Sequence, residues 1–444
     1  MATPAYRIDI KTDLLAKIRD HSALVGVVGL GYVGLPFAVE KAKVGYRVIG
    51  IDRNAKRADM INHGENYIQD VRDEELRELV GQRLISAVSD YHQVGELDVI
   101  VICVPTPLTK NLTPDLRYVE SVTREIAPHI RPGQLVSLES TTYPGTTEEI
   151  MLPILESSGL KVEKDFYLAH SPERVDPGNK RYTTKNTTKV VGGVGPDSLE
   201  VAMAFYGQTI EKVVPVSNAR AAELTKVFEN TFRAVNIALV NELTLLCDRM
   251  GLNVWEVLDA ANTKPFGIMP FYPGPGVGGH CIPLDPHYLE WKAKEYNFNT
   301  HFIALAGEIN RKMPEFVREK TVRVLNKLGK APSKANVLVL GVAYKKDLDD
   351  YRESPAIEVI KELAKDRINL VYHDPYVPEF REHGLHMTSV PLTAELLHEV
   401  DLVVITTDHS NIDYKWLVDT ANHVLDTRNA TRHVKTHRER ITLL

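Results

Sequence analysis

The sequence predicts an α/β fold in which two Rossmann-like parallel-sheet domains are joined by a helical middle domain with one long helix. Three patterns along the 444 residues support this. Short β-branched runs alternate with helical segments in both terminal parts, which is typical of βαβ units. Between these parts lies a long segment with apolar residues at helical spacing. We place the domains at residues 1–215, 216–330 and 331–444.

The N-terminal domain contains the predicted strands of the first sheet. They are short, apolar and rich in β-branched residues, and they cover residues 24–29, 46–52, 98–104, 134–139 and 166–170. Helical patterns lie between them, for example over residues 36–44 and 146–157. Strands that alternate with helices in this way predict a parallel sheet.

The middle and C-terminal parts differ in pattern. Residues 218–250 lack glycine and proline, and at ~1.5 Å per residue they predict one helix of roughly 45–50 Å. Residues 265–286 are too rich in proline and glycine for regular structure. The alternation then resumes, with a helix from Pro355 and strands over residues 336–342, 369–373, 402–406 and 423–426.

Composition excludes several classes of protein. The net charge of -6 argues against general affinity for nucleic acid, which requires a basic face. Apolar runs have the length of strands, too short to span a bilayer, and the N-terminus does not resemble a secretory signal. The three cysteines, Cys103, Cys247 and Cys281, have neither disulfide nor metal-ligand spacing. We therefore expect a cytoplasmic protein with no metal, nucleic-acid or membrane partner.

A dinucleotide fingerprint follows the first predicted strand, in the segment Gly29-Leu30-Gly31-Tyr32-Val33-Gly34. Gly29 permits a tight turn, Gly31 lets a pyrophosphate approach the backbone, and Gly34 allows close helix–strand packing. Asp52, at the end of the second strand, suits the ribose 2′-hydroxyl of NAD and would repel the phosphate of NADP. NADP is the alternative cofactor, because Arg53 lies beside Asp52. The alternative for the whole segment is an ordinary strand–helix turn that binds no dinucleotide.

The segment around Cys281 predicts covalent chemistry. Glycines precede Cys281 and prolines follow it, which would fix the thiol on an exposed, rigid loop. A thiolate is a strong nucleophile and its thioester is activated, while Asp285 could act as a base or position water. A buried, inert cysteine is the alternative, and it describes Cys103, inside a strand, and Cys247, on the long helix.

Two further features concern ligands. Lys226 and Asn230 lie four residues apart on one face of the long helix and could stabilise an oxyanion. A solvated lysine beside a surface asparagine is the alternative. Gly341, at the corresponding place in the last domain, lacks the dinucleotide fingerprint, so we expect that domain to bind another ligand.

Over essentially its whole length, the chain resembles the UDP-glucose/GDP-mannose dehydrogenase family. The resemblance rests on several motifs in the family's order: Gly29-Leu30-Gly31-Tyr32-Val33-Gly34-Leu35-Pro36, Val104-Pro105-Thr106-Pro107, Ser140-Thr141-Thr142-Tyr143-Pro144-Gly145-Thr146, Ser171-Pro172-Glu173-Arg174, Lys226 with Asn230, Gly278-Gly279-His280-Cys281, Gly341-Val342-Ala343-Tyr344-Lys345-Lys346-Asp347 and Arg352-Glu353-Ser354. It implies a three-domain homodimer or larger homo-oligomer, NAD on the N-terminal domain, and the nucleotide of a UDP-sugar on the C-terminal domain.

The resemblance also implies roles for individual residues. Cys281 matches the nucleophile, Lys226 and Asn230 the oxyanion-stabilising groups, and Glu173 an acid–base carboxylate. Asp285 and Thr142 match groups that organise the hydrolytic water. The cofactor positions are Gly29, Gly31, Tyr32, Val33, Gly34, Asp52, Arg53, Pro105, Thr106, Thr142 and Arg352. The substrate positions are Glu173, Arg174, Lys226, Asn230, Tyr272, Gly276, Gly279, Tyr344, Lys345 and Arg428.

The implied reaction is the four-electron oxidation of a UDP-sugar C6 alcohol to the uronate, in polysaccharide biosynthesis. Two positions differ from the UDP-glucose branch of the family. Leu284 stands where that branch usually has a lysine. That branch also supplies an arginine from the partner subunit ahead of the cysteine loop, but here no arginine lies between Arg249 and Cys281. Residues 262–276 and 280–286 resemble instead the UDP-N-acetylglucosamine 6-dehydrogenase branch. UDP-N-acetylglucosamine is therefore the expected substrate, with UDP-N-acetylgalactosamine and UDP-glucose as alternatives.

Two other functions compete with this reading. A two-electron hydroxyacid dehydrogenase would share the N-terminal fold and the long helix, but it would need neither Cys281 nor a nucleotide-binding C-terminal domain. A non-catalytic nucleotide-sugar sensor would bind its ligand without turnover. The joint presence of Cys281, Lys226, Asn230 and Asp285 argues against a sensor.

Overall fold

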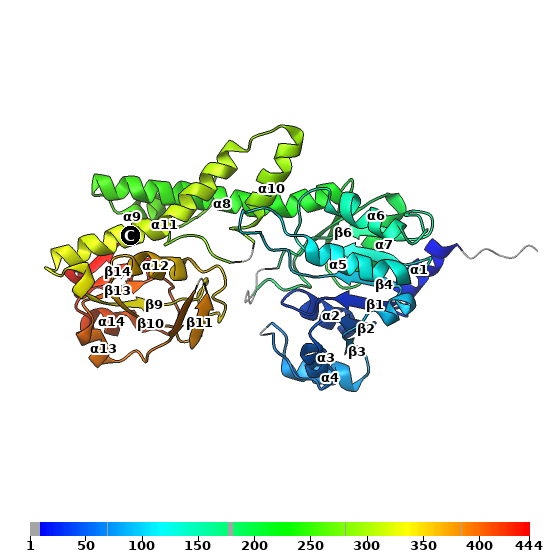
Figure 1. Cartoon of the computed structure of the whole chain (residues 1–444), viewed down its shortest axis with the longest axis horizontal. Coiled ribbons are helices and arrows are strands. Elements are labelled where there is room, and N and C mark those ends of the chain that lie inside the picture. The colour runs from blue at the N-terminus through cyan, green and yellow to red at the C-terminus, as the bar shows by residue number, and fades with distance from the viewer. Residues whose placement is uncertain (1–8, 69, 176–180, 280, 383) are drawn as a thin grey trace, which may run out of the picture. The chain divides into compact units, whose positions relative to one another are not determined.

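The computed structural model describes residues 9–68, 70–175, 181–279, 281–382 and 384–444. The chain forms two compact units, labelled by their elements in Figure 1. Unit 1 comprises Met1–Glu229 and Trp291–Asn297, and unit 2 comprises Asn230–Glu290 and Phe298–Leu444. Helix α8 (Ala219–Met250) begins in unit 1 and ends in unit 2. The division into three domains stays a prediction.

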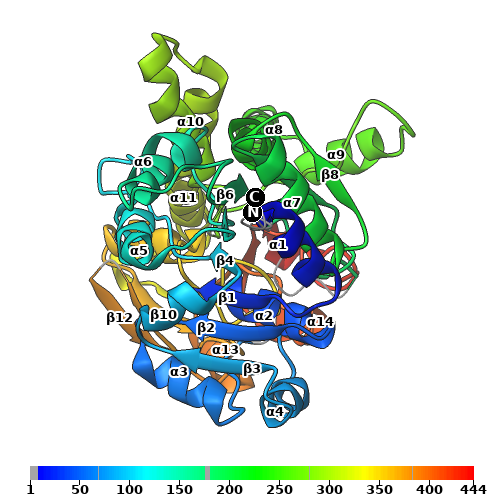
Figure 2. The ribbon, with the colours of Figure 1, turned by 90° about the vertical axis from the view of Figure 1, so that its right-hand side faces the viewer.

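Unit 1 is built on a sheet whose strand order, within the described residues, is β3-β2-β1-β4-β5-β6-β7-β8. Neighbouring strands are parallel except β6 and β7, which pair antiparallel. Figure 2 shows β1, β2 and β3 side by side. The strands are β1 (Leu24–Val28), β2 (Arg47–Ile51), β3 (Ile85–Val88), β4 (Val99–Ile102), β5 (Leu135–Leu138), β6 (Tyr167–His170), β7 (Lys189–Gly193) and β8 (Val213–Pro215).

The strands of unit 1 contribute alternate residues to two cores. In β4, Val99 and Val101 join one core, while Ile100 and Ile102 join the other, because successive side chains point to opposite faces. The first core includes α1 (Ile10–Arg19), α2 (Gly34–Lys43), α3 (Ala55–Asn62), α4 (Asp73–Gly81) and α7 (Pro196–Gly207). The second includes α5 (Arg117–Ile126) and α6 (Leu152–Glu156). Unit 1 also contains the short helical turns η1 (His92–Glu96), η2 (Ala127–His129) and η3 (Thr147–Met151).

The first turns of α8 are tied to the loop after β5 by the buried carboxylate of Glu223. It accepts hydrogen bonds from the Gly145 N–H at 2.5 Å, the Thr147 N–H at 2.8 Å and the Thr147 hydroxyl at 2.6 Å. Burial raises the pKa of Glu223 to about 7 even though these donors lower it. Glu223 therefore fixes the loop that carries Thr142 against α8.

Unit 2 contains a parallel sheet of strand order β10-β9-β13-β14-β15 in the described chain. The strands are β9 (Asn336–Leu340), β10 (Asn369–His373), β13 (Leu402–Ile405), β14 (Val424–Asp426) and β15 (Ile441–Leu443), with a separate antiparallel pair, β11 (Glu379–Glu382) and β12 (Leu385–Thr388). Helices α11 (His301–Lys327) and α12 (Pro355–Ala364) pack in one core of the sheet, and α13 (Ala394–Glu399) and α14 (Tyr414–Thr420) in the other. The remaining elements of unit 2 are α9 (Val254–Asn262), η5 (Pro332–Lys334) and η6 (Arg438–Arg440). Helix α10 (Asp285–Ala293) begins in unit 2 and ends in unit 1, to which η4 (Lys294–Tyr296) also belongs.

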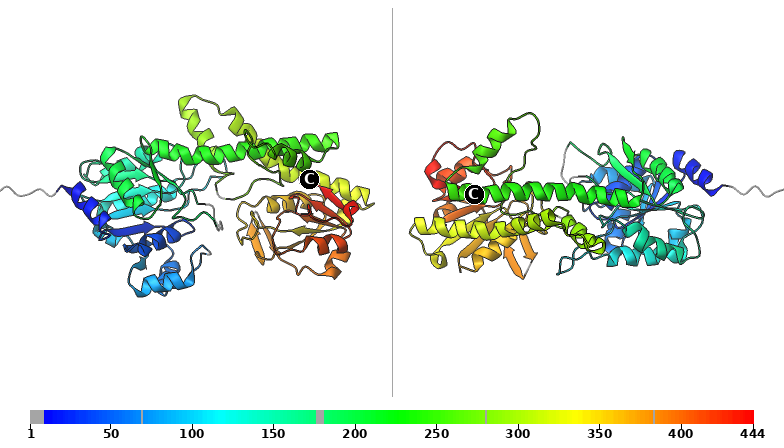
Figure 3. Two further views of the ribbon diagram at one scale, coloured as in Figure 1. Left: turned by 180° about the vertical axis from the view of Figure 1, so that it is seen from behind. Right: turned by 90° about the horizontal axis from the view of Figure 1, so that it is seen from above.

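Polar contacts hold the C-terminal half of α8 to α11, and Figure 3 shows α8 as one uninterrupted helix. Asn241 donates to the side-chain oxygen of Asn310 at 2.9 Å. Nearer the end of α8, Asp248 accepts from Lys320 at 2.9 Å and from Arg323 at 2.8 Å. These contacts join two segments that are far apart in the sequence.

The predicted fold class is confirmed, and several details differ. The predicted helix over residues 146–157 begins as the π-helical turn η3, because Pro153 has no N–H to donate in a regular ladder. Regular structure returns at Asp285 rather than after Pro286, which is the second residue of α10 and tolerated there. The sequence did not predict β3 or the antiparallel β6–β7 pair. Among the described residues, no helix is long and apolar enough to cross a membrane.

Candidate functional site

The glycine-rich turn between β1 and α2 has the close contacts that a dinucleotide site requires. Gly29 has a φ of 91°, and a Cβ there would lie 2.5 Å from the carbonyl oxygen of Cys103. A Cβ on Gly34 would overlap the carbonyl oxygen of Gly29. At Gly31, by contrast, no described atom lies within 4 Å of a Cβ position, so the backbone is open to a ligand. The turn therefore fits a pyrophosphate.

Asp52 holds this turn from the end of β2. Its Oδ2 accepts from the Leu30 N–H at 2.9 Å, and its Oδ1 accepts from the Asn54 N–H at 2.9 Å. Arg57 lies 3.7 Å from Oδ2, while the neighbouring Arg53 is exposed. Asp52 thus lies against the glycine turn with a cation close by, and its role at the ribose of NAD stays a prediction.

The other predicted cofactor positions of unit 1 lie on loops that follow strands of the same sheet. Tyr32 and Pro105 are exposed, and Val33 and Thr106 are half-buried. The loop after β4 is held by Ser140, whose hydroxyl donates to the Val104 carbonyl at 2.7 Å. Thr142 is buried, and within the described residues its hydroxyl has no hydrogen-bond partner. A bound ligand or water would supply that partner.

The prediction that Cys103 lies inside a strand is wrong. β4 ends at Ile102, so Cys103 directly follows the strand, although its N–H still donates to the Val28 carbonyl at 2.8 Å. Its side chain is half-buried beside the turn that contains Gly29 and Gly34. Burial and the Glu139 carboxylate raise the pKa of its thiol well above the usual value. Cys247 is buried in a small core, as predicted for an inert cysteine.

Glu173 belongs to a cluster of charged groups in unit 1. Its Oε1 accepts from the backbone N–H groups of Arg174 at 2.8 Å and Val175 at 2.7 Å, and its Oε2 lies 3.3 Å from Lys189 Nζ. Burial raises the pKa of Glu173, but Lys189, the Val175 N–H and Lys226 outweigh it and hold the pKa below its ordinary value. Glu173 is therefore a carboxylate at neutral pH.

Arg174, the neighbouring predicted substrate residue, makes contacts within unit 1. Its Nη2 and Nε form a two-pronged ion pair with Glu229 on α8 at 2.6 and 3.1 Å. Its Nη1 donates to the carbonyl of Thr188 at 2.7 Å. These contacts join the segment after β6 to α8, three residues beyond Lys226.

Cys281 lies at a turn that leads into α10. Its carbonyl accepts from the N–H groups of Leu284 at 3.1 Å and Asp285 at 2.8 Å, and its side chain is half-buried. The buried Asp285 Oδ2 accepts from Asn230 Nδ2 at 2.6 Å. Asn230 and Asp285 are thus in direct contact, and Asp285 follows Cys281 by four residues. His280 lies outside the described residues.

The glycines before Cys281 pack directly on the C-terminal sheet's loops. A Cβ on Gly276 would lie 2.8 Å from Pro355 Cβ, and one on Gly279, which has a φ of 92°, would lie 3.0 Å from the ring of Tyr344. A Cβ on Gly274 would lie 2.5 Å from Arg428 Nη1, whose Nε donates to the Thr406 carbonyl at 2.9 Å. Close packing therefore brings the cysteine loop to the loop that carries Tyr344 and Lys345.

That second loop is held by Asp374, at the end of β10. Its buried Oδ2 accepts from the N–H groups of Val342 at 2.7 Å and Ala343 at 3.0 Å, and lies 3.0 Å from Nε2 of the buried His409. The Asp347 N–H donates to His409 Nδ1 at 3.0 Å. Asp374 occupies in this sheet the place that Asp52 has in unit 1. Because its carboxylate is enclosed by these partners, it does not offer a ribose site.

The remaining predicted positions of unit 2 are less enclosed. Tyr272 is exposed, donates to Asp259 at 3.0 Å and stacks on Trp255. Lys345 is half-buried, and the exposed Arg352 forms a two-pronged ion pair with Asp350 at 2.9 and 2.7 Å.

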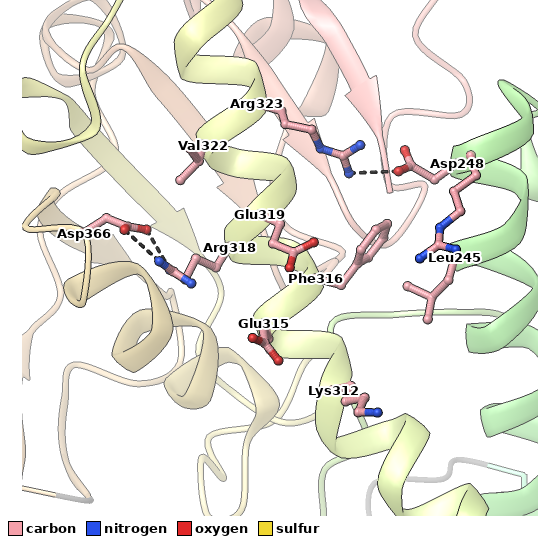
Figure 4. Close-up of a pocket in the computed structure, with 11 residues that line it drawn as sticks. Leu245, Asp248, Lys312, Glu315, Phe316, Arg318, Glu319, Val322, Arg323 and Asp366 are labelled. Carbon is pink, nitrogen blue, oxygen red and sulfur yellow. Dashed lines mark hydrogen bonds and ion pairs between the residues drawn. The ribbon is translucent and has the colours of Figure 1, made fainter.

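A hollow of about 710 Å³ lies between α8 and α11, shown in Figure 4. Ion pairs between Arg318 and Asp366 and between Arg323 and Asp248 border it. Its lining in the described chain includes none of the predicted site residues, so we do not assign the chemistry to it.

Sequence reasoning missed the groups that hold the site loops from a distance: Lys189, Glu139, Glu223, Asp374 and His409. The available signal was a charged residue at the edge of an apolar run, as in Lys189 before two valines and two glycines. Such a signal does not identify the partner.

Comparison with known proteins gives a consistent result over three segments. The model of the UDP-glucose/GDP-mannose dehydrogenase family, NAD binding domain, matches residues 23–210. The models of that family's central domain and UDP binding domain match residues 220–312 and 338–433.

The chain is similar to several characterised relatives. It is 36% identical over 411 residues to UDP-N-acetyl-D-mannosamine dehydrogenase of Pyrococcus horikoshii, covering 91% of this chain and 95% of the relative. It is 36% identical over 372 residues to UDP-N-acetyl-D-glucosamine 6-dehydrogenase of Pseudomonas aeruginosa, covering 83% and 87%. The solved structure of the Pyrococcus horikoshii UDP-D-ManNAc dehydrogenase matches with a TM-score of 0.86 at 34% identity, covering 95% and 98%.

Asp52 sets a testable cofactor preference. Asp52→Asn keeps an oxygen that accepts from the Leu30 N–H but removes the charge that repels a 2′-phosphate. We expect the ratio of NAD to NADP affinity to fall by roughly tenfold, about 1.4 kcal/mol. Asp52→Ala should also loosen the turn and weaken both cofactors. Binding titrations with each cofactor measure this, and equal affinity of the unmodified protein for NAD and NADP would contradict it.

Proposed function

Because this chain belongs to the UDP-glucose/GDP-mannose dehydrogenase family and is an NAD-dependent UDP-sugar dehydrogenase, we propose that it oxidises the C6 alcohol of UDP-N-acetylglucosamine to a carboxylate. One observation supports this most. The loop before Cys281 packs on Tyr344, which brings the thiol's segment next to Lys345 in the part of the chain matched by the UDP binding domain.

The proposed chemistry proceeds through a thioester on Cys281. NAD, when bound, accepts the hydride that leaves C6 in each oxidation. After the first oxidation, the sulfur of Cys281 adds to the C6 aldehyde and gives a thiohemiacetal. Loss of the second hydride leaves the thioester. Water then displaces the sulfur, so that each sugar consumes one water and two NAD.

Asn230 and Asp285 suit the hydrolytic step. Asp285 is buried, and the Asn230 amide donates to one of its carboxylate oxygens at 2.6 Å. That contact fixes the carboxylate, and a carboxylate can act as the base that accepts a proton from an attacking water. We assign Asp285 as the group that organises water, with Asn230 holding it.

Glu173, Lys226 and Thr142 complete the proposed set. Lys226 is half-buried on α8, acts electrostatically on Glu173, and carries a cation suited to a developing oxyanion. Glu173 is held as a carboxylate and can receive a proton during thioester formation and hydrolysis. The partnerless hydroxyl of Thr142 within the described residues suits a hydrogen bond to water.

The acetamido sugar is supported by the segment around the nucleophile and by relatives. Residues 262–276 and 280–286 resemble the UDP-N-acetylglucosamine branch, and two similar proteins are named UDP-N-acetyl-D-glucosamine 6-dehydrogenase. UDP-N-acetylmannosamine is the second candidate, because a relative covered over 95% of its length is named for that sugar. The two sugars share the acetamide and differ in configuration at C2.

Self-association is supported by an apolar stripe on α8. Phe232, Leu239, Leu246 and Met250 are exposed at spacings that keep them on one helix face. A large exposed apolar patch marks a protein interface, and a twofold pair of identical chains is the commonest solution. We propose that α8 contributes to a homo-oligomer interface.

Replacing the nucleophile tests the thioester. We expect Cys281→Ala to lose at least about a thousandfold in uronate formation, because no sulfur is available to trap the aldehyde. Binding of UDP and NAD should persist. Cys247→Ala is the control and should reduce thermal stability with little loss of turnover. Substantial carboxylate production by Cys281→Ala would exclude the mechanism.

A sugar panel tests the substrate. We expect kcat/KM for UDP-N-acetylglucosamine to exceed that for UDP-glucose by at least tenfold, about 1.4 kcal/mol, because a site built for the acetamide leaves polar groups unpaired without it. Two NADH should form per sugar. Preference for the mannose or galactose epimer would correct the sugar only. One NADH per sugar would indicate a two-electron dehydrogenase.

The α8 stripe makes a separate prediction. Leu239→Asp should place a charge in the interface and shift the light-scattering mass of the micromolar protein toward that of one chain. Arg233→Glu is the control, since Arg233 is exposed about a third of a turn away from the stripe. An unmodified protein that is already a single chain would contradict the interface.

A further inference from the structure

We propose that Lys189 is a positioning residue for Glu173: it fixes that carboxylate and keeps it ionised, while Glu139 anchors the lysine from the other side. The inference rests on the proposed function, in which Glu173 exchanges protons during thioester chemistry. Neither Lys189 nor Glu139 lies in a motif that the sequence singled out.

The three side chains form a buried ion cluster at the ends of neighbouring strands. Lys189 begins β7, and its side chain is only 4% exposed. Its Nζ lies 3.1 Å from Oε2 of Glu139, which directly follows β5 and is buried, and 3.3 Å from Oε2 of Glu173. The lysine therefore bridges two carboxylates, one that precedes β6 in the sequence and one that follows it.

Lys189 remains charged in spite of its burial. Burial lowers its pKa, but Glu139 and Glu173 outweigh burial and raise the pKa above its ordinary value. Burial raises the pKa of Glu139, and Lys189 opposes that rise from 3.1 Å away. Removal of Lys189 would leave two carboxylates facing one another without a cation.

Among the residues that the structure describes, Lys189 and Lys226 are the cations that lower the pKa of Glu173. At the end of β6, burial lowers the pKa of His170 to about 3, so that imidazole is neutral. At the end of β4, burial raises the pKa of the Cys103 thiol, which is neutral as well. The adjacent Arg174 guanidinium is paired with Glu229 on α8.

Rings from α2 and α7 also lie near the Lys189 ammonium. Its Nζ lies 5.3 Å from the centre of the Tyr206 ring, and burial raises the pKa of that phenol well above its usual value. Lys41 donates to the Phe205 carbonyl at 2.6 Å, and burial lowers its pKa well below normal. Tyr206 is therefore neutral, and Lys41 is directed to a different acceptor.

The arrangement differs from a pairing that serves folding alone. Buried ion pairs can often be replaced by apolar side chains without loss of stability. One carboxylate, Glu139, already balances Lys189 in the interior. The second, Glu173, is 16% exposed and is the one that the mechanism uses. The lysine thus connects a fully buried carboxyl group, Glu139, to the more exposed one, Glu173.

The test is the pH dependence of kcat/KM for the UDP-sugar. In the unmodified protein the pKa of Glu173 lies below its ordinary value, so its protonation should not limit the rate near neutral pH. In Lys189→Met, we expect the midpoint of the fall in kcat/KM on the acid side to move to higher pH by about 1–3 pH units. The rate should be recovered at still higher pH. Lys189→Arg, which keeps the cation, should restore the normal profile.

Two double variants make the result specific. The double variant Lys189→Met with Glu139→Gln also removes the buried carboxylate that has lost its partner, and this removal should protect the fold. The acid-side midpoint should then return part of the way toward its value in the unmodified protein. Lys189→Met with Glu173→Gln should have no raised limb, because the titrating group is gone. A raised limb that survives Glu173→Gln would overturn the proposal.

Lys292→Met is the matched control. Lys292 is also 4% exposed and bridges two carboxylates, Glu149 and Glu295, each at 2.6 Å. The Lys292→Met variant should lower the midpoint temperature of unfolding without shifting the acid side of the pH profile of kcat/KM. If Lys189→Met does only the same, Lys189 is structural and the inference is wrong. If the unmodified protein makes no uronate from any UDP-sugar, the proposed function itself fails.

Discussion

Parallel strand pairing is the constraint on which the candidate sites depend. In unit 1, the hydrogen-bonded register of β1, β2, β4 and β5 brings their carboxyl ends to one edge of the sheet. Gly29, Asp52, Cys103 and Glu139 directly follow those four strands. Ligands of open α/β sheets bind at this edge because loops from separate strands meet there. The backbone ladder thus positions the side chains before any of them contacts another.

In both sheets an aspartate after the second strand holds the loop that follows the first strand, but the two aspartates have different partners. In each, an aspartate at the end of the second strand accepts hydrogen bonds from the loop after the first strand: Asp52 from Leu30, and Asp374 from Val342 and Ala343. Asp374 is also paired with the buried His409, whereas Asp52 has the open position of Gly31 beside its turn. This difference makes the first of these turns the one suited to a dinucleotide.

Buried charge is concentrated around the loops that carry the proposed chemistry. Glu223 ties the Thr142 loop to α8, and Lys189 joins Glu139 to Glu173. Charges are costly to remove from water and persist inside proteins only with partners. Partners of this kind restrict where a carboxylate can lie and set whether it is ionised. The interior of unit 1 therefore influences the acid–base state of a group at its edge.

Local patterns in the sequence determined the glycine turn, most strands and the length of α8, because periodicity and the absence of glycine or proline act over neighbouring residues. They also indicated Cys281, whose surroundings are local. Only the tertiary structure decided which charges meet. Glu139 and Lys189 are 50 residues apart, and Asn230 and Asp285 are 55 apart. Such contacts depend on strand order, on the antiparallel pairing of β6 with β7, and on close packing of glycine loops. A local pattern encodes none of these.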